Sequence, residues 1–179
     1  MSLLDNIDLP DSPDSVFMHR FDQGENRFRI LQEPTTGHVW WPEEGGKPQR
    51  VASTTDIPTG AEAKYFWFFP VALGDDIKFL EIKQMTVMQQ LKALEGNKEW
   101  GDLTQYDVTV TRSGEKLETT YTVVPNPKAQ LKDEVADRWA GMLKRYQPDE
   151  LFNGGSVLMD TQEDDSSAQT DKELSLIHI

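Results

Sequence analysis

The sequence predicts a mainly β protein with one folded domain, two helices and acidic ends. Short runs that alternate polar and apolar residues, or that are rich in aromatic and β-branched residues, recur between glycine and proline breaks. Only two segments show the spacing of an amphipathic helix. The net charge of −13 is uneven, because residues 1–15 and 160–173 are strongly acidic whereas 16–159 contain all but one of the 18 lysines and arginines.

The composition excludes several kinds of site. The absence of cysteine excludes disulfides, thiolate catalysis and cysteine-ligated zinc. The three histidines, His19, His38 and His178, are too scattered to indicate a metal site. No apolar stretch approaches the roughly 20 residues of a membrane span. The N-terminus has no basic region followed by an apolar run, so we expect a cytoplasmic protein. We also expect no cofactor.

Three main strands are expected before the first helix. The first alternates charged and apolar side chains, which places Phe28 and Ile30 inward. The second is aromatic and apolar enough to be covered on both faces, and the third pairs back on it as a hairpin. A further short strand is expected between the first and the second. In chain order, the four strands are expected over 27–31, 50–54, 65–73 and 77–83.

A helix and two more strands follow. Thr86 begins a capping-box pattern and Gly96 ends the helix. Strands rich in threonine and valine are expected over 106–112 and 119–124, followed by an amphipathic helix over 129–146. Five strands with a helix between the third and the fourth are the arrangement of an OB-fold. The predicted fold is therefore a five-stranded OB-fold-like barrel with an appended C-terminal helix.

The domain is expected to span residues 16–153, between disordered acidic segments at 1–15 and 154–179. Residues 174–179 turn apolar abruptly and look like the in-frame translation of a transposase sequencing adapter, as in a metagenomic shotgun assembly. An ordinary apolar tail is the alternative. The acidic tail has two interpretations. It keeps the protein soluble, or it mimics phosphates and either occupies the basic surface until a polyanion displaces it or recruits partners.

Seven segments of the chain resemble bacteriophage single-stranded DNA-binding proteins. They are 27–31 (RFRIL), 66–67 (FW), 79–84 (FLEIKQ), the expected helix 87–94 (VMQQLKAL), 99–102 (EWGD), 106–112 (YDVTVTR) and 117–125 (LETTYTVVP). The resemblance covers roughly residues 24–153. It implies an OB-fold that coats and protects single strands during phage DNA replication and recombination, without catalysis, in the cytoplasm of an infected bacterium. Some phage relatives carry a structural zinc, which we do not expect here because cysteine is absent.

Candidate DNA-binding residues are aromatic rings that could stack on bases and basic side chains that could contact phosphates. Lys64, Phe66 and Phe68 share one face of their strand, whereas Trp67 lies on a uniformly apolar face expected to be the barrel interior. The complete set is Arg27, Arg29, Trp40, Trp41, Arg50, Lys64, Phe66, Phe68, Phe79, Lys83, Arg112 and Tyr121.

Several of these assignments have a structural alternative. Arg27 and Arg29 could lie on an ordinary solvated strand face, and the appended helix could cover Phe66 and Phe68. The loop that contains Trp40 and Trp41 could fold onto the core instead of clamping a base, and Tyr121 could be core packing. No pattern of catalytic residues emerges, so an enzyme is not expected. The protein could also be a phage structural or assembly β-barrel that mediates protein contacts, or a barrel that encloses a small ligand.

Overall fold

The computed structural model describes residues 17–159, which form two compact units. Of the described residues, unit 1 contains 17–34 and 66–135, and unit 2 contains 35–65 and 136–159. The acidic leader and the tail from residue 160 onward lie outside the described residues, so the expectations about them stay predictions. None of the helices within 17–159 is long and apolar enough to cross a membrane.

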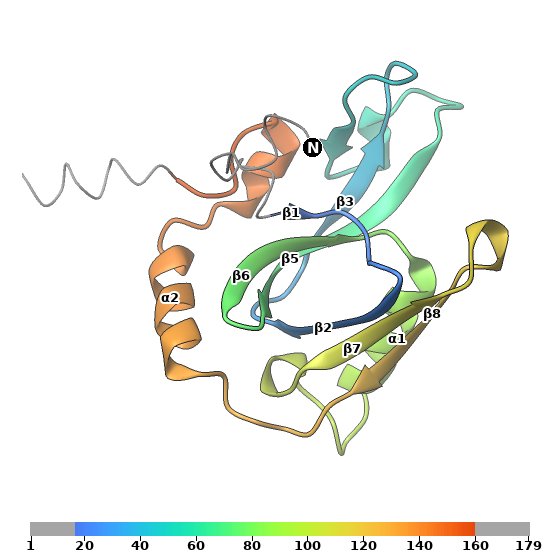
Figure 1. The fold of residues 1–179 in the computed structure, drawn as a ribbon. Helices are drawn as coiled ribbons and strands as arrows, with labels where there is room; N and C mark the ends of the chain where they lie inside the picture. The colour runs from blue at the N-terminus through green and yellow to red at the C-terminus, as the bar shows by residue number, and fades with distance from the viewer. Residues whose placement is uncertain (1–16, 160–179) are drawn as a thin grey trace, which may run out of the picture. The chain divides into compact units, whose positions relative to one another are not determined.

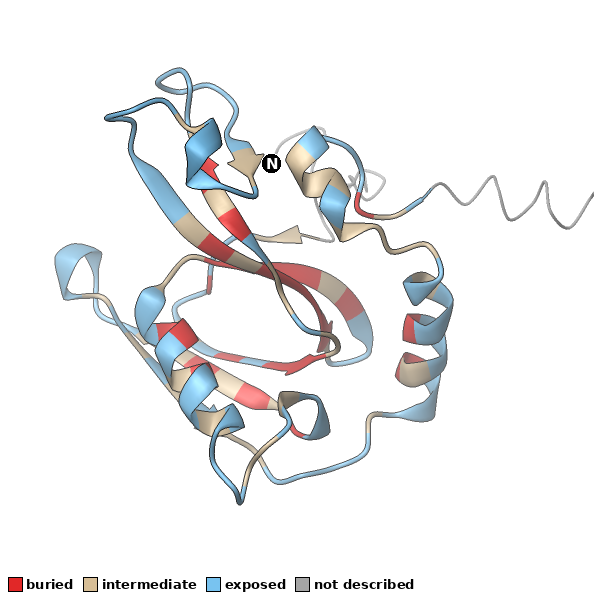
Figure 2. Cartoon of the chain, turned by 180° about the vertical axis from the view of Figure 1, so that it is seen from behind, coloured by how far each residue is buried: buried red, intermediate tan, exposed pale blue. Residues whose placement is uncertain are grey.

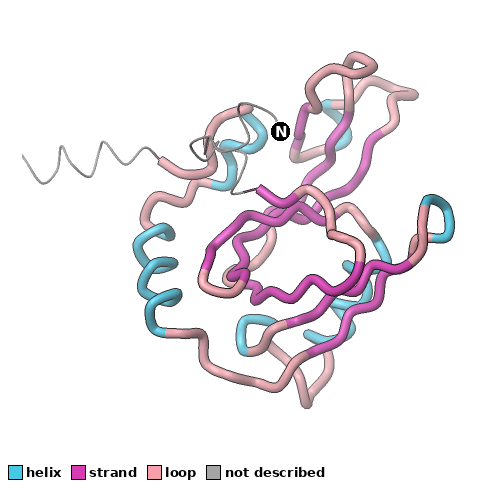
Figure 3. Tube along the Cα trace, viewed as in Figure 1, coloured by secondary structure: helices cyan, strands magenta, loops and turns pink. Residues whose placement is uncertain are grey.

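Unit 1 is built on an open sheet with the strand order β1-β6-β5-β2-β7-β8 (Figures 1 and 3). Its strands are β1 (Phe17–Met18), β2 (Gly24–Ile30), β5 (Ala63–Leu73), β6 (Asp76–Ile82), β7 (Val108–Ser113) and β8 (Thr120–Pro125). Strand β5 begins in unit 2 and continues into unit 1. All neighbouring strands are antiparallel except β1 and β6, which are parallel.

The register divides the side chains of this sheet into two faces, because residues directly opposite each other in antiparallel strands point to the same side. The inner face contains the pairs Phe28–Val108, Ile30–Val71 and Phe69–Leu80. The outer face contains the pairs Arg29–Ala72, Pro70–Phe79 and Phe68–Glu81. All of these residues are buried (Figure 2). Strand β5 is therefore covered on both faces as the sequence predicts, and β6 is covered on both faces as well.

Helix α1 (Met85–Glu95) connects β6 to β7. It also supplies hydrogen-bond partners to backbone groups of β8 at the edge of the sheet. The side chain of Gln90 donates to the carbonyl of Tyr121 at 3.0 Å and accepts from the amide of Val123 at 2.9 Å. One amide group therefore replaces a neighbouring strand for two backbone groups of β8. The predicted capping box is wrong, because the N-cap is Gln84 and it makes no side-chain cap hydrogen bond; the end at Gly96 is confirmed.

Two single-turn helices flank β7. They are η3 (Leu103–Gln105) and η4 (Lys116–Glu118), and η4 forms the connection between β7 and β8. Gly114 precedes η4 at φ +81°, and a Cβ there would clash with the carbonyl oxygen of Glu118. This hairpin end therefore requires glycine at position 114.

Unit 2 contains the antiparallel hairpin of β3 (Thr35–Trp40) and β4 (Gln49–Val51), and β3 also pairs with β5. Its other elements are η2 (Thr54–Asp56), η5 (Pro148–Asn153) and most of α2 (Asp133–Leu143), which begins in unit 1. Burial raises the pKa of Tyr146 in this unit to about 12, so its hydroxyl stays protonated at neutral pH.

Residues 154–159, which the sequence analysis places in the tail, belong to the folded part of unit 2. The amide of Gln147 donates to the carbonyl of Val157 at 2.7 Å, and the amide of Met159 donates to the carbonyl of Arg145 at 2.8 Å. The side chain of Val157 is buried. These backbone hydrogen bonds extend the folded part to Met159.

The prediction of a mainly β protein is confirmed, and the five main predicted strands coincide with β2, β5, β6, β7 and β8. The predicted short strand overlaps β4 but begins one residue later. Helix α2 is shorter than predicted, because residues 129–132 run without helical structure before it begins at Asp133. Strands β1 and β3 were not predicted from the sequence.

Candidate functional site

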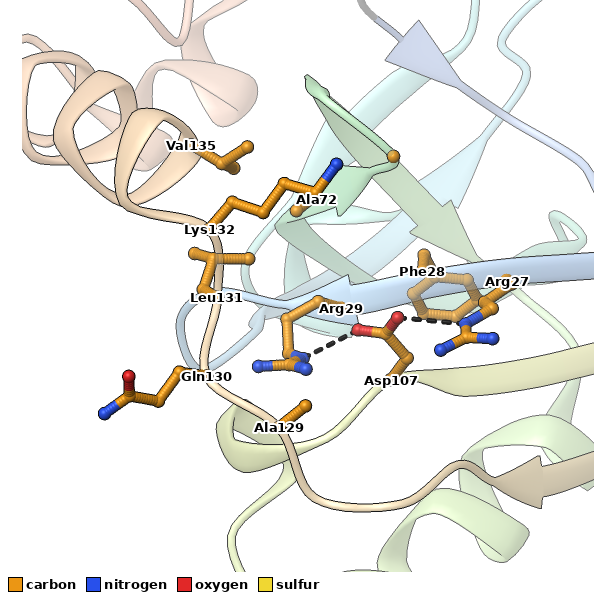
Figure 4. Close-up of a pocket in the computed structure, with 11 residues that line it drawn as sticks. Arg27, Phe28, Arg29, Ala72, Asp107, Ala129, Gln130, Leu131, Lys132 and Val135 are labelled. Atoms are coloured by element: carbon orange, nitrogen blue, oxygen red, sulfur yellow. Dashed lines mark hydrogen bonds and ion pairs between the residues drawn. The ribbon is translucent and has the colours of Figure 1, made fainter.

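The outer face of unit 1 carries a pocket of about 410 Å³ at the end where β2 and β5 meet (Figure 4). Its floor comes from the outer side of these two strands, and residues 129–135 form its opposite wall. We call it the cationic pocket, because two arginines and a lysine line it against a single carboxylate. The lining residues used below are Arg27, Arg29, Ala72, Asp107, Leu131 and Lys132.

Asp107 bridges the two arginines of the cationic pocket. Its Oδ2 accepts from Nε of Arg27 at 3.0 Å, and its Oδ1 accepts from Nε of Arg29 at 2.8 Å. Alternation along β2 directs both arginines to the outer face, while Asp107 immediately precedes β7. Both ion pairs thus connect the first and fourth of the predicted strands.

The two arginines differ in exposure. The side chain of Arg29 is 5% exposed and also donates to the carbonyl of Thr104 at 3.4 Å. The side chain of Arg27 is 60% exposed, and its Nη1 and Nη2 have no hydrogen-bond partner within residues 17–159. Arg29 therefore holds the pocket in place, whereas Arg27 has donors left for an anion.

The carbonyl that Arg29 contacts is held by a capped turn. Asp102 accepts from the amide and the hydroxyl of Thr104 at 2.9 and 2.8 Å. These hydrogen bonds hold the pKa of Asp102 below its ordinary value of 3.8, because they stabilise the carboxylate. The cap fixes η3 and with it the carbonyl of Thr104 behind Arg29.

The opposite wall supplies the third cation. Lys132 donates to Asp75 at 3.0 Å, and both side chains are exposed. The hydrogen bond to Asp75 is the main reason that the pKa of Lys132 lies above its ordinary value. The amide of Ala129 donates to the carbonyl of Gln105 at 3.3 Å, which anchors the wall near the turn that holds Arg29.

The prediction that Phe66, Phe68 and Phe79 form an exposed stacking surface is wrong. They lie on the outer face, but none of these side chains is more than 1% exposed. The ring of Phe17, from β1, lies 6.2 Å from that of Phe68 and 5.8 Å from that of Phe79. Burial of Phe68 and Phe79 therefore includes cover by a strand that the sequence analysis did not predict. Trp67 lies opposite Ile82 and is half-buried.

The predicted phosphate contact Lys83 is engaged by a neighbouring carboxylate. Its Nζ lies 3.2 Å from Oε1 of Glu81, whose side chain is 1% exposed, and His19 lies 3.6 Å from the same oxygen. Lys83 compensates a buried charge and is not a free cation. Sequence reasoning missed Glu81, because nothing local indicates that its strand face is covered.

Arg112 and Tyr121 lie opposite each other on β7 and β8 and hold another aromatic residue in place. Arg112 donates to the carbonyl of Phe21 at 2.9 Å, and the Tyr121 ring lies 6.0 Å from the Phe21 ring. Both side chains are half-buried. Tyr121 therefore packs against another aromatic ring, as the alternative interpretation of this residue expects. One nitrogen of the Arg112 guanidinium is occupied by the backbone hydrogen bond.

The remaining candidates lie in unit 2. Trp40 ends β3 opposite Gln49 and is half-buried, as is Arg50 on β4. Trp41 is 41% exposed and Lys64 is exposed. The structure therefore brings Arg27 and Arg29 into one pocket, and it places Trp40, Trp41, Arg50 and Lys64 in a separate unit.

Comparisons with protein-family models, with curated proteins and with solved structures found no match to this chain. Within residues 17–159 no group of three or more histidine or acidic side chains could hold a metal ion.

Proposed function

We propose that this protein binds single-stranded DNA without sequence preference, with the strand crossing the outer face of unit 1 at the cationic pocket. The sheet order supports the proposal. Strands β7, β2, β5 and β6 are the fourth, first, second and third main strands, which is the spatial order of a Greek key. Strand β8 extends this order and α1 follows the third main strand, as in a partly open OB-fold barrel.

The observation that carries the proposal is the cationic pocket. OB-folds bind oligonucleotides on the face of their second and third strands, and the pocket lies on the outer side of the first and second. Arg27 offers two unpaired nitrogens, and Lys132 faces it from the opposite wall. A phosphate in this pocket would meet two cations whose nearest carboxylates are already engaged.

The resemblance to phage single-stranded DNA-binding proteins extends the proposal to a biological role. The protein would coat and protect single strands during phage replication and recombination, in the cytoplasm of an infected bacterium. It would act without catalysis, and its acidic tail would recruit replication proteins.

A fluorescent oligo(dT) tests the proposal through anisotropy over a series of salt concentrations. We expect binding that weakens with salt, since phosphate contacts release counterions. Arg27→Ala should lower the slope of log affinity against log salt by about 0.7, the value of one phosphate contact on a single strand. Lys92→Ala is the matched control, because Lys92 is exposed on α1 and does not line the pocket.

A second candidate function is that of a phage structural or assembly protein. Leu117, in η4 between β7 and β8, is fully exposed, and Val124 on β8 is 49% exposed. Exposed apolar side chains at one edge of the sheet favour protein contacts. Flat anisotropy at micromolar protein and low salt, together with self-association that Leu117→Ser abolishes, would favour this candidate.

A further inference from the structure

We infer that unit 2 contains a second DNA contact, in which nucleobases stack on the rings of His38, Trp40 and Tyr65. This inference rests on the proposed function and adds to it a site outside the cationic pocket. The three rings lie on one face of the sheet that β3 and β4 form with the start of β5. We call this face, with its three rings, the aromatic face.

Alternation along β3 separates the aromatic face from a packed face. His38 and Trp40 point to one side of the strand, and Val39 points to the other. The side chain of Val39 is fully buried, whereas those of His38 and Trp40 are half-buried. The Tyr65 ring is also half-buried and lies 5.3 Å from that of His38, which places it on the same side. Three aromatic rings therefore remain partly open to solvent on one face.

The ring nitrogens on the aromatic face are not held by the protein. Nδ1 of His38 and Nε1 of Trp40 have no hydrogen-bond partner within residues 17–159. Buried polar atoms in a layer that serves packing alone normally have a partner. Both rings can therefore turn toward a ligand without breaking a hydrogen bond at these atoms. A thymine carbonyl is an acceptor of the kind that Nε1 of Trp40 lacks.

The spacing along β3 suits a stacked base. Side chains on the same face of a strand follow each other at about 7 Å, which is twice the roughly 3.4 Å between stacked bases. One base therefore fits between the positions of His38 and Trp40, and the Tyr65 ring extends the face beside His38. Such stacking is independent of sequence, because every base has a π-face.

The aromatic face differs from the cationic pocket in charge. On β4, Gln49 and Val51 share this face, because they lie opposite Trp40 and His38. Arg50, between them, points to the packed face. Neither β3 nor β4 thus places a lysine or arginine on the aromatic face. Stacking there releases no counterions, so it should add the same factor to the affinity at every salt concentration.

The first arm of the test compares Trp40→Leu with Trp40→Phe in oligo(dT) anisotropy at pH 8 over the salt series. Leucine keeps an apolar side chain without a ring, so Trp40→Leu should weaken binding by about 5- to 150-fold, as for one lost stacking contact, with an unchanged salt slope. Trp40→Phe keeps a ring and should recover most of this loss. Arg27→Ala is the opposite control, since it should lower the slope. Thermal melting checks that each variant is folded.

The second arm uses the full chain labelled with 5-fluorotryptophan, which gives one fluorine resonance for each of the five tryptophans. Trp40→Phe and Trp139→Phe identify two of them. We expect oligo(dT) to move the Trp40 resonance, because a stacked base adds its ring current. The Trp139 resonance should stay, since that ring is buried and packs 5.7 Å from the Tyr146 ring. If Trp40→Leu does not fold, the Trp40 resonance decides.

Two results would overturn the aromatic face and leave the proposed function standing. In the first, the unmodified chain binds oligo(dT), folded Trp40→Leu keeps the same affinity and the Trp40 resonance does not move. In the second, folded Trp40→Leu and Trp40→Phe weaken binding equally, which would mean that a ring is not what DNA contacts. If the unmodified chain shows no binding at any salt concentration, the proposed function and the aromatic face both fail.

Discussion

The outer face of unit 1 offers a comparison between two regions that share strand β5 and differ in what covers them. At one end, Phe68 and Phe79 are covered by a ring from β1. At the other end, Arg27 remains 60% exposed in a pocket that its ion pair with Asp107 leaves open. An exposed aromatic pair costs free energy in water, whereas an exposed guanidinium does not. A face that contains both therefore needs a cover over only one of them.

The largest expected effect concerns the covered end. Phe68→Ala should lower the free energy of unfolding by about 3–5 kcal/mol, because the ring is buried and its loss leaves a cavity. Phe17→Ala should lower it by about 1 kcal/mol, since that ring is half-buried at an edge. Urea unfolding followed by circular dichroism measures both. Equal effects would show that β1 is as firmly held as β5.

The second effect separates the two arginines. Arg29→Ala should lower the free energy of unfolding by about 1–3 kcal/mol, because it removes a buried donor from Asp107 and Thr104. Arg27→Ala should lower it by no more than about 1 kcal/mol, as for an exposed ion pair. The same urea experiment compares them. A larger loss for Arg27→Ala would contradict the division into a holding arginine and a binding arginine.

The sequence predicts features that depend on neighbouring residues, but not contacts between residues that are far apart along the chain. Alternation alone assigned Phe68 to the outer side of its strand and both arginines of β2 to one side. Whether an outer face is covered depends on segments far away in sequence. Phe17 lies more than fifty residues before the rings it covers, in a strand of two residues that has no detectable period. Asp107 is likewise distant from Arg29, and an isolated aspartate before a strand has no signature of an ion pair.

The missed and shortened elements have similar causes. Strand β3 contains Gly37 and two threonines, so its sequence shows no clean alternation, and its pairing with β4 stabilises it. Helix α2 loses its first predicted turn, because the amide of Ala129 donates to the carbonyl of Gln105 in η3 and residues 129–132 line the cationic pocket. In both cases tertiary contacts outweigh a local pattern.

The third effect tests how the open end depends on pH. The folded-state pKa of Asp102 lies below 3.8, so the stability it contributes is present above the unfolded value and is lost as the pH falls through the folded value. Unfolding by urea at several pH values should show that the difference between the unmodified protein and Asp102→Asn shrinks below about pH 4. A constant difference from pH 6 to pH 2 would show that this carboxylate does not support the turn behind Arg29.

The smallest effect on stability is expected at Lys132. Its side chain and that of Asp75 are both exposed, so Lys132→Ala should leave the melting temperature unchanged. The variant should nevertheless lower the salt slope of oligo(dT) binding by up to about 0.7, because Lys132 faces the pocket. Thermal melting and anisotropy on the same sample measure both quantities. An unchanged slope would mean that Lys132 makes no phosphate contact and that the contact comes from Arg27 on β2 alone.

The central claim is that the outer face of unit 1 is where single-stranded DNA lies. Hydrogen exchange with and without saturating oligo(dT) tests it most directly, because it maps protection along the whole chain. We expect slower exchange in peptides that cover 27–31, 70–75 and 128–133, which contain the floor and the wall of the cationic pocket. Protection confined to the connection between β7 and β8, with these three peptides unchanged, would contradict the claim.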